Sequence, residues 1–261
     1  MTTWVLLRGL TREARHWGDF SPCLSRAFDG AAVITLDLPG NGMMCRITSP
    51  VRIDAVTEYC RAQLSNRGVP PPYRLVAISL GGIVAVDWAA RHAHEIDAAV
   101  LINTSMRPFS AFYHRLRVGA WPTLLRLMVP GLSFTKREEL IFALTSNLPQ
   151  APAGLIDIWV AIRRSRPVTM ANAVRQLVAA TQFRVSATAN SVDMLVLASK
   201  GDRLVDARCS QALAQKWGCE IAMHASAGHD LPLDDADWVV SQIGNWMARR
   251  GATAGTATGV V

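Results

Sequence analysis

Cysteine is scarce in this sequence, and no two cysteines form a C-x-x-C pair. The 261 residues contain five cysteines, an odd number, scattered between positions 23 and 219. In a long chain this usage argues against a disulfide framework. We expect the five thiols to stay reduced and to act as small buried side chains without catalytic or metal-binding roles.

The chain also lacks a leader-like segment and a long apolar run. Residues 1–10 contain no basic leader and no small-residue cleavage site, so we expect a strand there rather than a signal peptide. The longest apolar stretch, residues 75–86, is interrupted by Ser79, Gly81 and Gly82 and is too short to span a bilayer. A cytoplasmic protein without stable membrane insertion is therefore expected.

The share of charged residues is low, and the sequence contains no internal repeat. Charged residues make up 18% of the chain and hydrophobic residues 50%, which is typical of a folded globular protein rather than a disordered or fibrous one. The length exceeds that of a typical domain, but α/β folds often reach it as one unit with an insertion.

Short apolar runs alternate with helical patterns along most of the chain. The expected strands are residues 4–7, 33–36, 74–78, 98–102, 194–198 and 220–223. The expected helices are residues 53–64, 83–91, 206–217 and 235–249. This order predicts an α/β fold with a mainly parallel sheet and helices on both of its faces.

One stretch interrupts the alternation. Residues 107–190 carry helical patterns punctuated by six prolines, and no run in them is typical of a strand. We interpret this stretch as a helical lid inserted in a core made of residues 1–106 and 191–250. Residues 251–261 are small and without periodicity, and we expect them to form a disordered tail.

A serine among small residues follows the third expected strand. Residues 74–88 combine an apolar strand, Ser79 and a helix. A tight strand-to-helix turn needs small side chains two residues before and two after its central residue, and Ala77 and Gly81 meet this need. The pattern predicts a nucleophile elbow that presents the hydroxyl of Ser79.

A serine nucleophile needs a general base and an acid that orients the base. Asp202 follows the fifth expected strand, at the edge where ligands gather in open α/β sheets. Asp206 is an alternative acid, but its position suits the start of a helix. His229 lies in the loop after the sixth expected strand. The order Ser79, Asp202, His229 predicts a catalytic triad with those residues as nucleophile, acid and base.

The tetrahedral intermediate of acyl transfer needs backbone N–H donors for its oxyanion. Leu80, directly after the nucleophile, offers one. The second is expected from the loop after the first strand, where Gly9 allows close approach and Leu10 presents its N–H. This chemistry requires no metal and no organic cofactor.

These motifs together resemble the α/β-hydrolase superfamily, and within it the small-esterase branch that includes pimeloyl-acyl-carrier-protein methyl ester esterase. The likeness spans residues 4–249 and rests on residues 6–10, Trp17, residues 37–42, residues 79–82, residues 202–205 and residues 228–229. It implies the α/β-hydrolase fold. Two residues depart from the pattern: Arg8 replaces the usual histidine, and Ala77 replaces the first glycine of the elbow. A guanidinium cannot copy the hydrogen bonds of a compact imidazole, so the sequence leaves open how the oxyanion loop is braced.

Positive charge concentrates in the expected lid. Residues 107–190 hold 11 Lys or Arg and 3 Asp or Glu, a net charge of +8, against +7 for the whole chain. A solvated basic face explains this, but so does an acidic partner, a phosphate-bearing substrate or an anionic membrane surface. The resemblance implies an acidic acyl carrier protein at the lid. Nucleic acid is not expected, because no recognised nucleic-acid-binding motif is present.

We therefore predict a carboxylesterase-type serine hydrolase that acts on small esters with short to medium acyl chains. Substrate contacts are expected from His16, Phe109, Phe112, His114, Trp121 and Leu124. Two alternatives use the same machinery: a thioesterase or acyltransferase on carrier-bound acyl groups, and a lactone or carbon–carbon bond hydrolase. A third is a ligand-binding receptor that retains the fold without catalysis.

Overall fold

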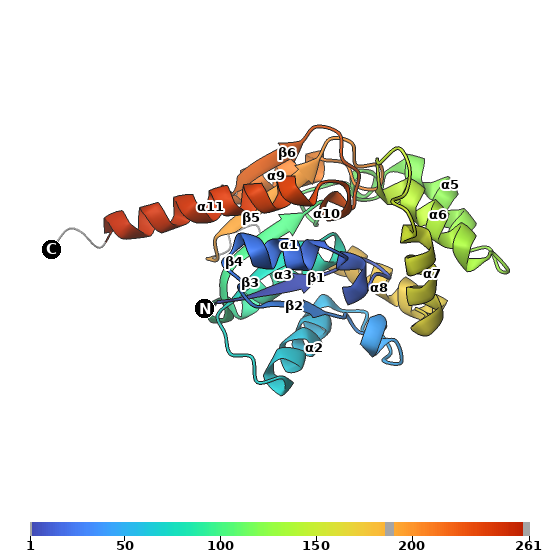
Figure 1. The fold of residues 1–261 in the computed structure, drawn as a ribbon, viewed down its shortest axis with the longest axis horizontal. Coiled ribbons are helices and arrows are strands. Elements are labelled where there is room, and N and C mark those ends of the chain that lie inside the picture. Colours follow the sequence, from blue (N-terminus) through green and yellow to red (C-terminus); the bar gives the residue numbers. More distant parts are fainter. Residues whose placement is uncertain (1, 186–190, 258–261) are drawn as a thin grey trace.

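The computed structural model describes residues 2–185 and 191–257, and its centre is a six-stranded parallel sheet (Figure 1). The order across the sheet is β2-β1-β3-β4-β5-β6. The strands are β1 (Thr3–Leu7), β2 (Val33–Leu36), β3 (Tyr73–Ile78), β4 (Ile96–Ile102), β5 (Met194–Ser199) and β6 (Glu220–His224). Each lies within two residues of its expected run, and the predicted α/β class is confirmed.

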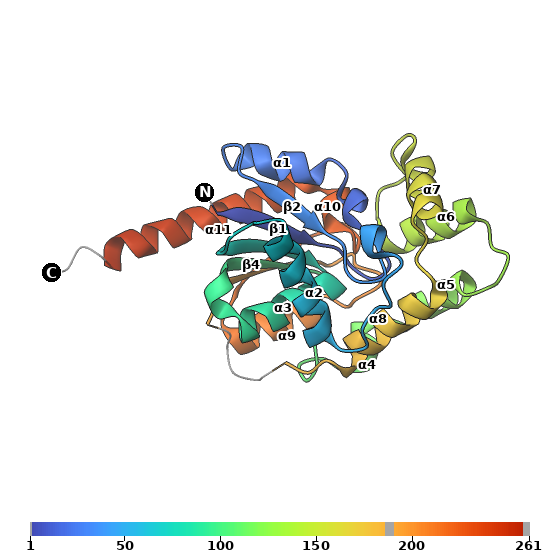
Figure 2. The same ribbon diagram turned by 90° about the horizontal axis from the view of Figure 1, so that it is seen from below.

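Side chains along the strands alternate between two apolar layers. In β1, Val5 and Leu7 belong to the core on one face, whereas Trp4 and Leu6 belong to the core on the other. Both faces of the sheet are therefore covered, and for this reason the strands are continuous apolar runs in the sequence. The first face carries α2 (Ile53–Asn66), α3 (Leu80–Arg91) and α9 (Arg208–Trp217), and the second carries α1 (Phe20–Ala27) and α11 (Ala236–Ala257) (Figures 1 and 2).

The order in which successive strands are added to the sheet reverses at β1. β2 lies on one side of β1, whereas β3 to β6 follow on the other side. The helices that follow β1 and β3 consequently pack on opposite faces, and ligand sites in such sheets lie outside the carboxyl ends of these strands. All six strands are parallel, so the loops that carry the predicted functional residues leave from the same edge.

The stretch between β4 and β5 is mainly helical, as expected for the insertion. Its helices gather at one end of the molecule, beyond the edge of the sheet that carries those loops (Figure 2). They are α4 (Phe112–Arg115), η4 (Val118–Ala120), α5 (Trp121–Leu127), α6 (Phe134–Thr145), α7 (Leu155–Ser165) and α8 (Met170–Gln182). That these helices act as a lid stays a prediction. Within residues 2–185 and 191–257, no helix combines the length and hydropathy needed to cross a bilayer.

Three helices differ from the sequence expectation. Helix α1 was not expected, because its buried residues are only Phe20 and Leu24 and a proline occupies its third position. The short helix α10 (Leu231–Asp234) was not expected either, and it precedes the last expected helix, residues 235–249, which corresponds to α11. Helix α11 continues to Ala257, although residues 251–257 were assigned to a disordered tail. Extending an anchored helix costs little; residues 258–261 lie outside the described residues.

Candidate active site

Ser79 occupies the turn between β3 and α3. Its φ of 55° and ψ of −118° are rare for a residue with a side chain. Its N–H donates to the carbonyl of Ile102 at 2.9 Å, and its own carbonyl accepts from the hydroxyl of Thr104 at 2.8 Å. The end of β4 therefore holds the strained turn on both sides. A nucleophile elbow, as predicted for Ser79, requires a strained turn of this kind.

Two glycines allow other backbone segments to approach this turn. A Cβ on Gly81 would lie 2.4 Å from the carbonyl oxygen of Leu7, so a larger residue does not fit there. A Cβ on Gly9 would lie 3.1 Å from the Cβ of Ser79 and 3.6 Å from its Oγ. The loop after β1 consequently runs directly beside the Ser79 side chain.

The backbone N–H groups of Leu10 and Leu80 have no hydrogen-bond acceptor among the described residues. Leu80 is the first residue of α3, and a first-turn N–H cannot be satisfied inside its own helix. Leu10 follows Gly9 in the loop beside Ser79. Unpartnered backbone donors close to one serine are what a developing oxyanion would need.

Asp202 and His229 form a buried pair. Nδ1 of His229 lies 2.7 Å from Oδ2 of Asp202, and the two side chains are 7% and 1% exposed. The other carboxylate oxygen, Oδ1, accepts from the N–H groups of Leu204 at 2.7 Å and Val205 at 2.9 Å. A carboxylate only accepts hydrogen bonds, so Nδ1 is the donor and Nε2 is left to accept a proton.

Asn103, which the sequence pattern does not single out, links the histidine loop to the sheet. Its Nδ2 donates to the carbonyl of His229 at 2.9 Å, and its Oδ1 accepts from the N–H of Ser199 at 2.9 Å. Residues 102–104 thus hold the backbones of both Ser79 and His229. Among the described residues, the Ser79 hydroxyl makes no hydrogen bond to His229; such bonds often form only with substrate bound. The sequence does carry one signal for Asn103, because it is a polar residue directly after a buried strand.

Arg8, the departure from the superfamily pattern, pairs with the residue after His229. Its two terminal nitrogens donate to the two carboxylate oxygens of Asp230 at 3.0 and 2.5 Å, and both side chains are about 5% exposed or less. The guanidinium also lies 4.9 Å from the ring centre of Trp17. Arg8 therefore ties the loop that carries Leu10 to the loop that carries His229.

Removing one partner of this pair is expected to destabilise the protein strongly. Arg8→Met or Asp230→Leu leaves a buried charge unpaired, which typically costs about 3–5 kcal/mol of unfolding free energy. The double variant should lose much less than the sum, since neither charge then remains. Urea denaturation measures the change, with Arg52→Met as control because Arg52 pairs with Asp54 at the exposed surface. An Arg8→Met protein as stable as the wild type would contradict this role.

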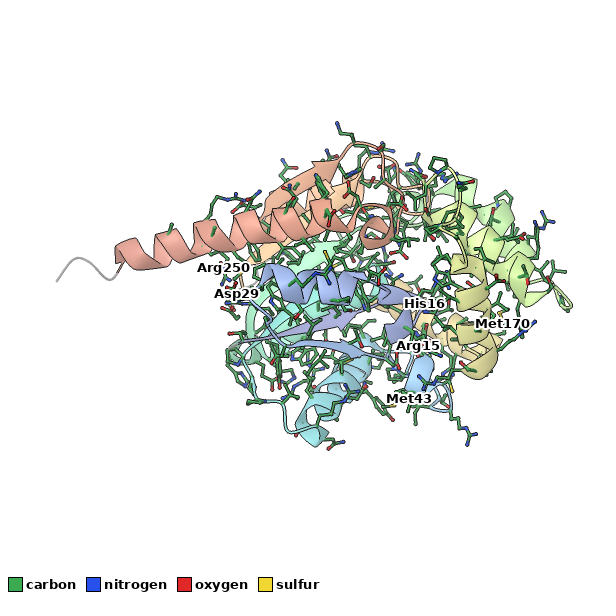
Figure 3. All side chains as sticks on the ribbon, viewed as in Figure 1. Arg15, His16, Asp29, Met43, Met170 and Arg250 are labelled. Atoms are coloured by element: carbon green, nitrogen blue, oxygen red, sulfur yellow. The ribbon has the colours of Figure 1, made fainter. Side chains whose placement is uncertain are left out.

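His16, an expected substrate contact, faces the insertion instead of an open pocket. Figure 3 shows Arg15 and His16 where the loop after β1 meets the inserted helices. The His16 ring packs edge-on against Trp159 of α7 at 5.9 Å, and Arg12 donates to its Nε2 at 3.0 Å. Burial, followed by the positive charge of Arg12, holds the pKa of His16 well below its ordinary value. The adjacent cavity of about 10 Å³ has room for a water molecule at most.

Glu138 joins the insertion to the same loop. This side chain of α6 is fully buried and accepts from Arg12 at 2.8 Å and from Arg163 of α7 at 2.5 Å. Arg12 also lies 4.1 Å from the ring centre of Trp159. The loop that carries Leu10 is therefore braced by the inserted helices on one side and by Asp230 on the other.

The structure does not bring the other expected substrate contacts into one pocket. Phe112 is 69% exposed and Trp121 is 41% exposed, so both face solvent. Phe109 packs against the core and meets Trp217 edge-on at 5.6 Å. His114 and Leu124 are half-buried, and the carbonyl of His114 accepts from the N–H of Asp206 at 2.9 Å.

Four of the five cysteines have thiols whose environment disfavours the reactive thiolate. All five lie in the described part of the chain, and none forms a disulfide. Burial raises the pKa of Cys60 to about 12 and that of Cys219 to about 11. Burial also raises the pKa of Cys23 and Cys209. These four thiols are therefore protonated, and poorly nucleophilic, near neutral pH.

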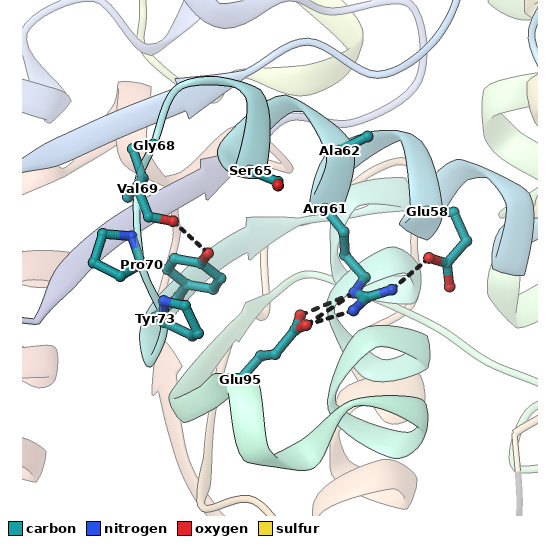
Figure 4. A pocket seen from close by; sticks show the side chains of 10 residues that line it. Glu58, Arg61, Ala62, Ser65, Gly68, Val69, Pro70, Tyr73 and Glu95 are labelled. Carbon is teal, nitrogen blue, oxygen red and sulfur yellow. Dashed lines mark hydrogen bonds and ion pairs between the residues drawn. The ribbon is translucent and has the colours of Figure 1, made fainter.

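A cavity of about 580 Å³ lies at the opposite edge of the sheet, around Tyr73 at the start of β3 (Figure 4). Each of its charged side chains is paired, because Arg61 pairs with both Glu95 and Glu58, and Glu58 also pairs with Arg91. Arg61 lowers the pKa of Glu95, and the indole N–H of Trp88 also donates to that carboxylate at 2.7 Å. The cavity therefore offers no unpaired charge for a ligand or a reaction.

Residues 4–242 match the model of the alpha/beta hydrolase family, and the chain belongs to that family. It is 26% identical over 247 residues to a pimeloyl-acyl-carrier-protein methyl ester esterase from Aromatoleum aromaticum, with 92% of this chain and 84% of that protein covered. A shorter match is 34% identical over 102 residues to the biotin biosynthesis bifunctional protein BioHC of Teredinibacter turnerae. It covers 39% of this chain and only 17% of that longer protein.

Solved structures show the same fold at low sequence identity. A meta-cleavage product hydrolase from Pseudomonas fluorescens superposes with a TM-score of 0.77 at 15% identity, over 96% of this chain and 92% of that one. An esterase from a Rhodococcus species gives a TM-score of 0.72 at 18% identity, over 95% and 90%. The expected α/β-hydrolase fold is thereby confirmed.

Proposed function

We propose that this protein is a serine hydrolase that cleaves carboxylic esters through an acyl-enzyme on Ser79. The observation that carries the proposal is the buried contact of 2.7 Å between His229 and Asp202, on a loop held by the strand end that also holds Ser79. A histidine fixed in the tautomer with an accepting Nε2 is what activation of a serine requires.

In this mechanism Nε2 of His229 takes the proton of Ser79 as Oγ bonds to the acyl carbon. The carbonyl electrons move onto the substrate oxygen, which accepts hydrogen bonds from the N–H groups of Leu10 and Leu80. Collapse breaks the bond to the alcohol oxygen, which leaves with the proton from His229. Water then repeats the sequence on the acyl-enzyme, giving the carboxylic acid and restoring Ser79.

An acyl group on an acidic carrier protein is a second candidate substrate. The name of the Aromatoleum relative supports it, as does the net charge of +8 in residues 107–190. A thioester or acyl-transfer reaction would use the same Ser79, Asp202 and His229. The helices of residues 107–190 would then serve as both lid and docking face. A lactonase or carbon–carbon bond hydrolase uses the same groups, but no feature of the insertion favours it.

A fluorophosphonate probe tests the proposal directly. The wild-type protein should be labelled, and peptide mass spectrometry should place the phosphonate on Ser79. In parallel, p-nitrophenyl esters of increasing acyl length and acyl thioesters should be hydrolysed, and the preferred series identifies the substrate class. Heat-denatured protein is the control. A folded protein that neither labels nor turns over any ester would support the receptor-like alternative instead.

A further inference from the structure

Large apolar side chains are unusually exposed on one part of the insertion. Of the 15 exposed large hydrophobic residues identified among the described residues, eight lie between positions 112 and 134. Four of them form an apolar stripe along η4 and α5, with exposed fractions of 41 to 65%: Val118, Trp121, Leu125 and Met128. Spacings of three and four residues place Trp121, Leu125 and Met128 on one side of α5, and Val118 precedes them in η4.

The same segment has only one sign of charge. Residues 98–137 contain six Lys or Arg and no Asp or Glu. The side chain of Arg126, on α5 itself, is exposed and makes no ion pair or hydrogen bond among the described residues. An exposed apolar stripe beside an unpaired cation is the pattern of a helix that lies at the surface of an anionic bilayer.

The fold holds this surface in place at both ends. Beyond the carboxyl end of α5, Arg137 of α6 donates to the carbonyls of Leu127, Val129 and Leu132. Before η4, the side chain of Arg117 donates to the carbonyl of Asp202 at 3.0 Å. The stripe is therefore presented to solvent by a braced segment, next to the loop of the candidate catalytic acid.

We propose that the apolar stripe and Arg126 bind the surface of a membrane that contains anionic lipids. A lipid surface fits the stripe better than an acidic protein does, because apolar and aromatic side chains form its centre and the cations lie beside them. Tryptophan in particular favours the boundary between headgroups and acyl chains. This binding does not depend on the hydrolase chemistry, so the failure of one proposal leaves the other standing.

Vesicle co-sedimentation of the full chain tests the proposal, with phosphatidylcholine vesicles compared with vesicles that also contain phosphatidylglycerol. The wild type should bind the anionic vesicles, and added salt should weaken binding. Leu125→Asp should lower the association constant about tenfold or more, and Arg126→Glu several-fold. Ile158→Asp and Arg164→Glu are the matched controls on α7, because both residues are exposed outside the stripe; they should leave binding unchanged.

Three outcomes would overturn the proposal: no binding to either vesicle, equal binding of Leu125→Asp and wild type, or a stripe that is buried in a dimer in solution. Analytical ultracentrifugation of wild type and Leu125→Asp detects the dimer. Capture of an acidic acyl carrier protein through Arg126, with no vesicle binding, would assign this surface to that partner instead. Circular dichroism melting shows that each variant is folded, and Leu125→Ser replaces any variant that is not.

Discussion

Ser79→Ala is expected to abolish labelling by a fluorophosphonate and to lower kcat by about 10⁴- to 10⁶-fold. The variant removes the Oγ atom that forms the acyl-enzyme in the proposed mechanism and keeps the Cβ, which the turn already accommodates. The φ of 55° at this position costs alanine no more than it costs serine. The free energy of unfolding of the variant should therefore be close to that of the wild type. Labelling, ester turnover and urea denaturation are measured together.

The control for this variant is Ser210→Ala. Ser210 is buried in α9 and makes only a long hydrogen bond of 3.4 Å to the carbonyl of Thr104. It should therefore be labelled and turn over esters like the wild type. Persistent labelling of Ser79→Ala would mean that another side chain is the nucleophile and would remove the basis of the proposed mechanism.

The strands and the tight turn at Ser79 were predictable because their signals are local. Continuous apolar runs mark a sheet covered on both faces, and Gly81 must be glycine because the carbonyl of Leu7 leaves no room for a Cβ. The sequence signal for helix α1 is weaker, because two buried residues and an early proline do not define an apolar stripe along a helix. Local patterns therefore located Ser79 but not every element around it.

The contacts that organise the candidate site could not be predicted, because they join residues far apart in the chain. Arg8 and Asp230 are 222 positions apart, and Asn103 reaches His229 across 126. A sequence shows which side chains can form ion pairs or hydrogen bonds, but the fold selects the partners. Arg8 could be recognised as a departure from the family pattern, whereas its pairing with Asp230, which joins the loop after β1 to the loop of His229, follows only from the structure.

The sequence also does not determine which surroundings the aromatic residues of the insertion face. Phe112 and Trp121 were predicted to contact substrate, because apolar and aromatic side chains commonly line ligand pockets. The structure exposes both of them. Periodicity identifies the apolar side of a helix, but it does not say whether that side faces the core, a partner or a membrane.

Asp202→Asn is expected to lower kcat by about 10³- to 10⁴-fold while the fold is kept. The carboxylate oxygen Oδ1 accepts from two backbone N–H groups, so the amide oxygen of asparagine must take that position. The amide NH₂ then faces Nδ1 of His229. Two donors cannot face each other, so the imidazole must carry its hydrogen on Nε2, where it can no longer take the proton of Ser79.

Steady-state kinetics of Asp202→Asn measures this effect, with Asp206→Asn as the matched control. The Arg208 side chain, which donates two hydrogen bonds to Asp206, lowers the pKa of that carboxyl to about 2. Asp206 is thus paired with Arg208 and not with His229. Its amide variant should therefore keep activity close to that of the wild type. If Asp206→Asn lost activity and Asp202→Asn kept it, Asp206 would be the acid and the loop would have to rearrange on substrate binding.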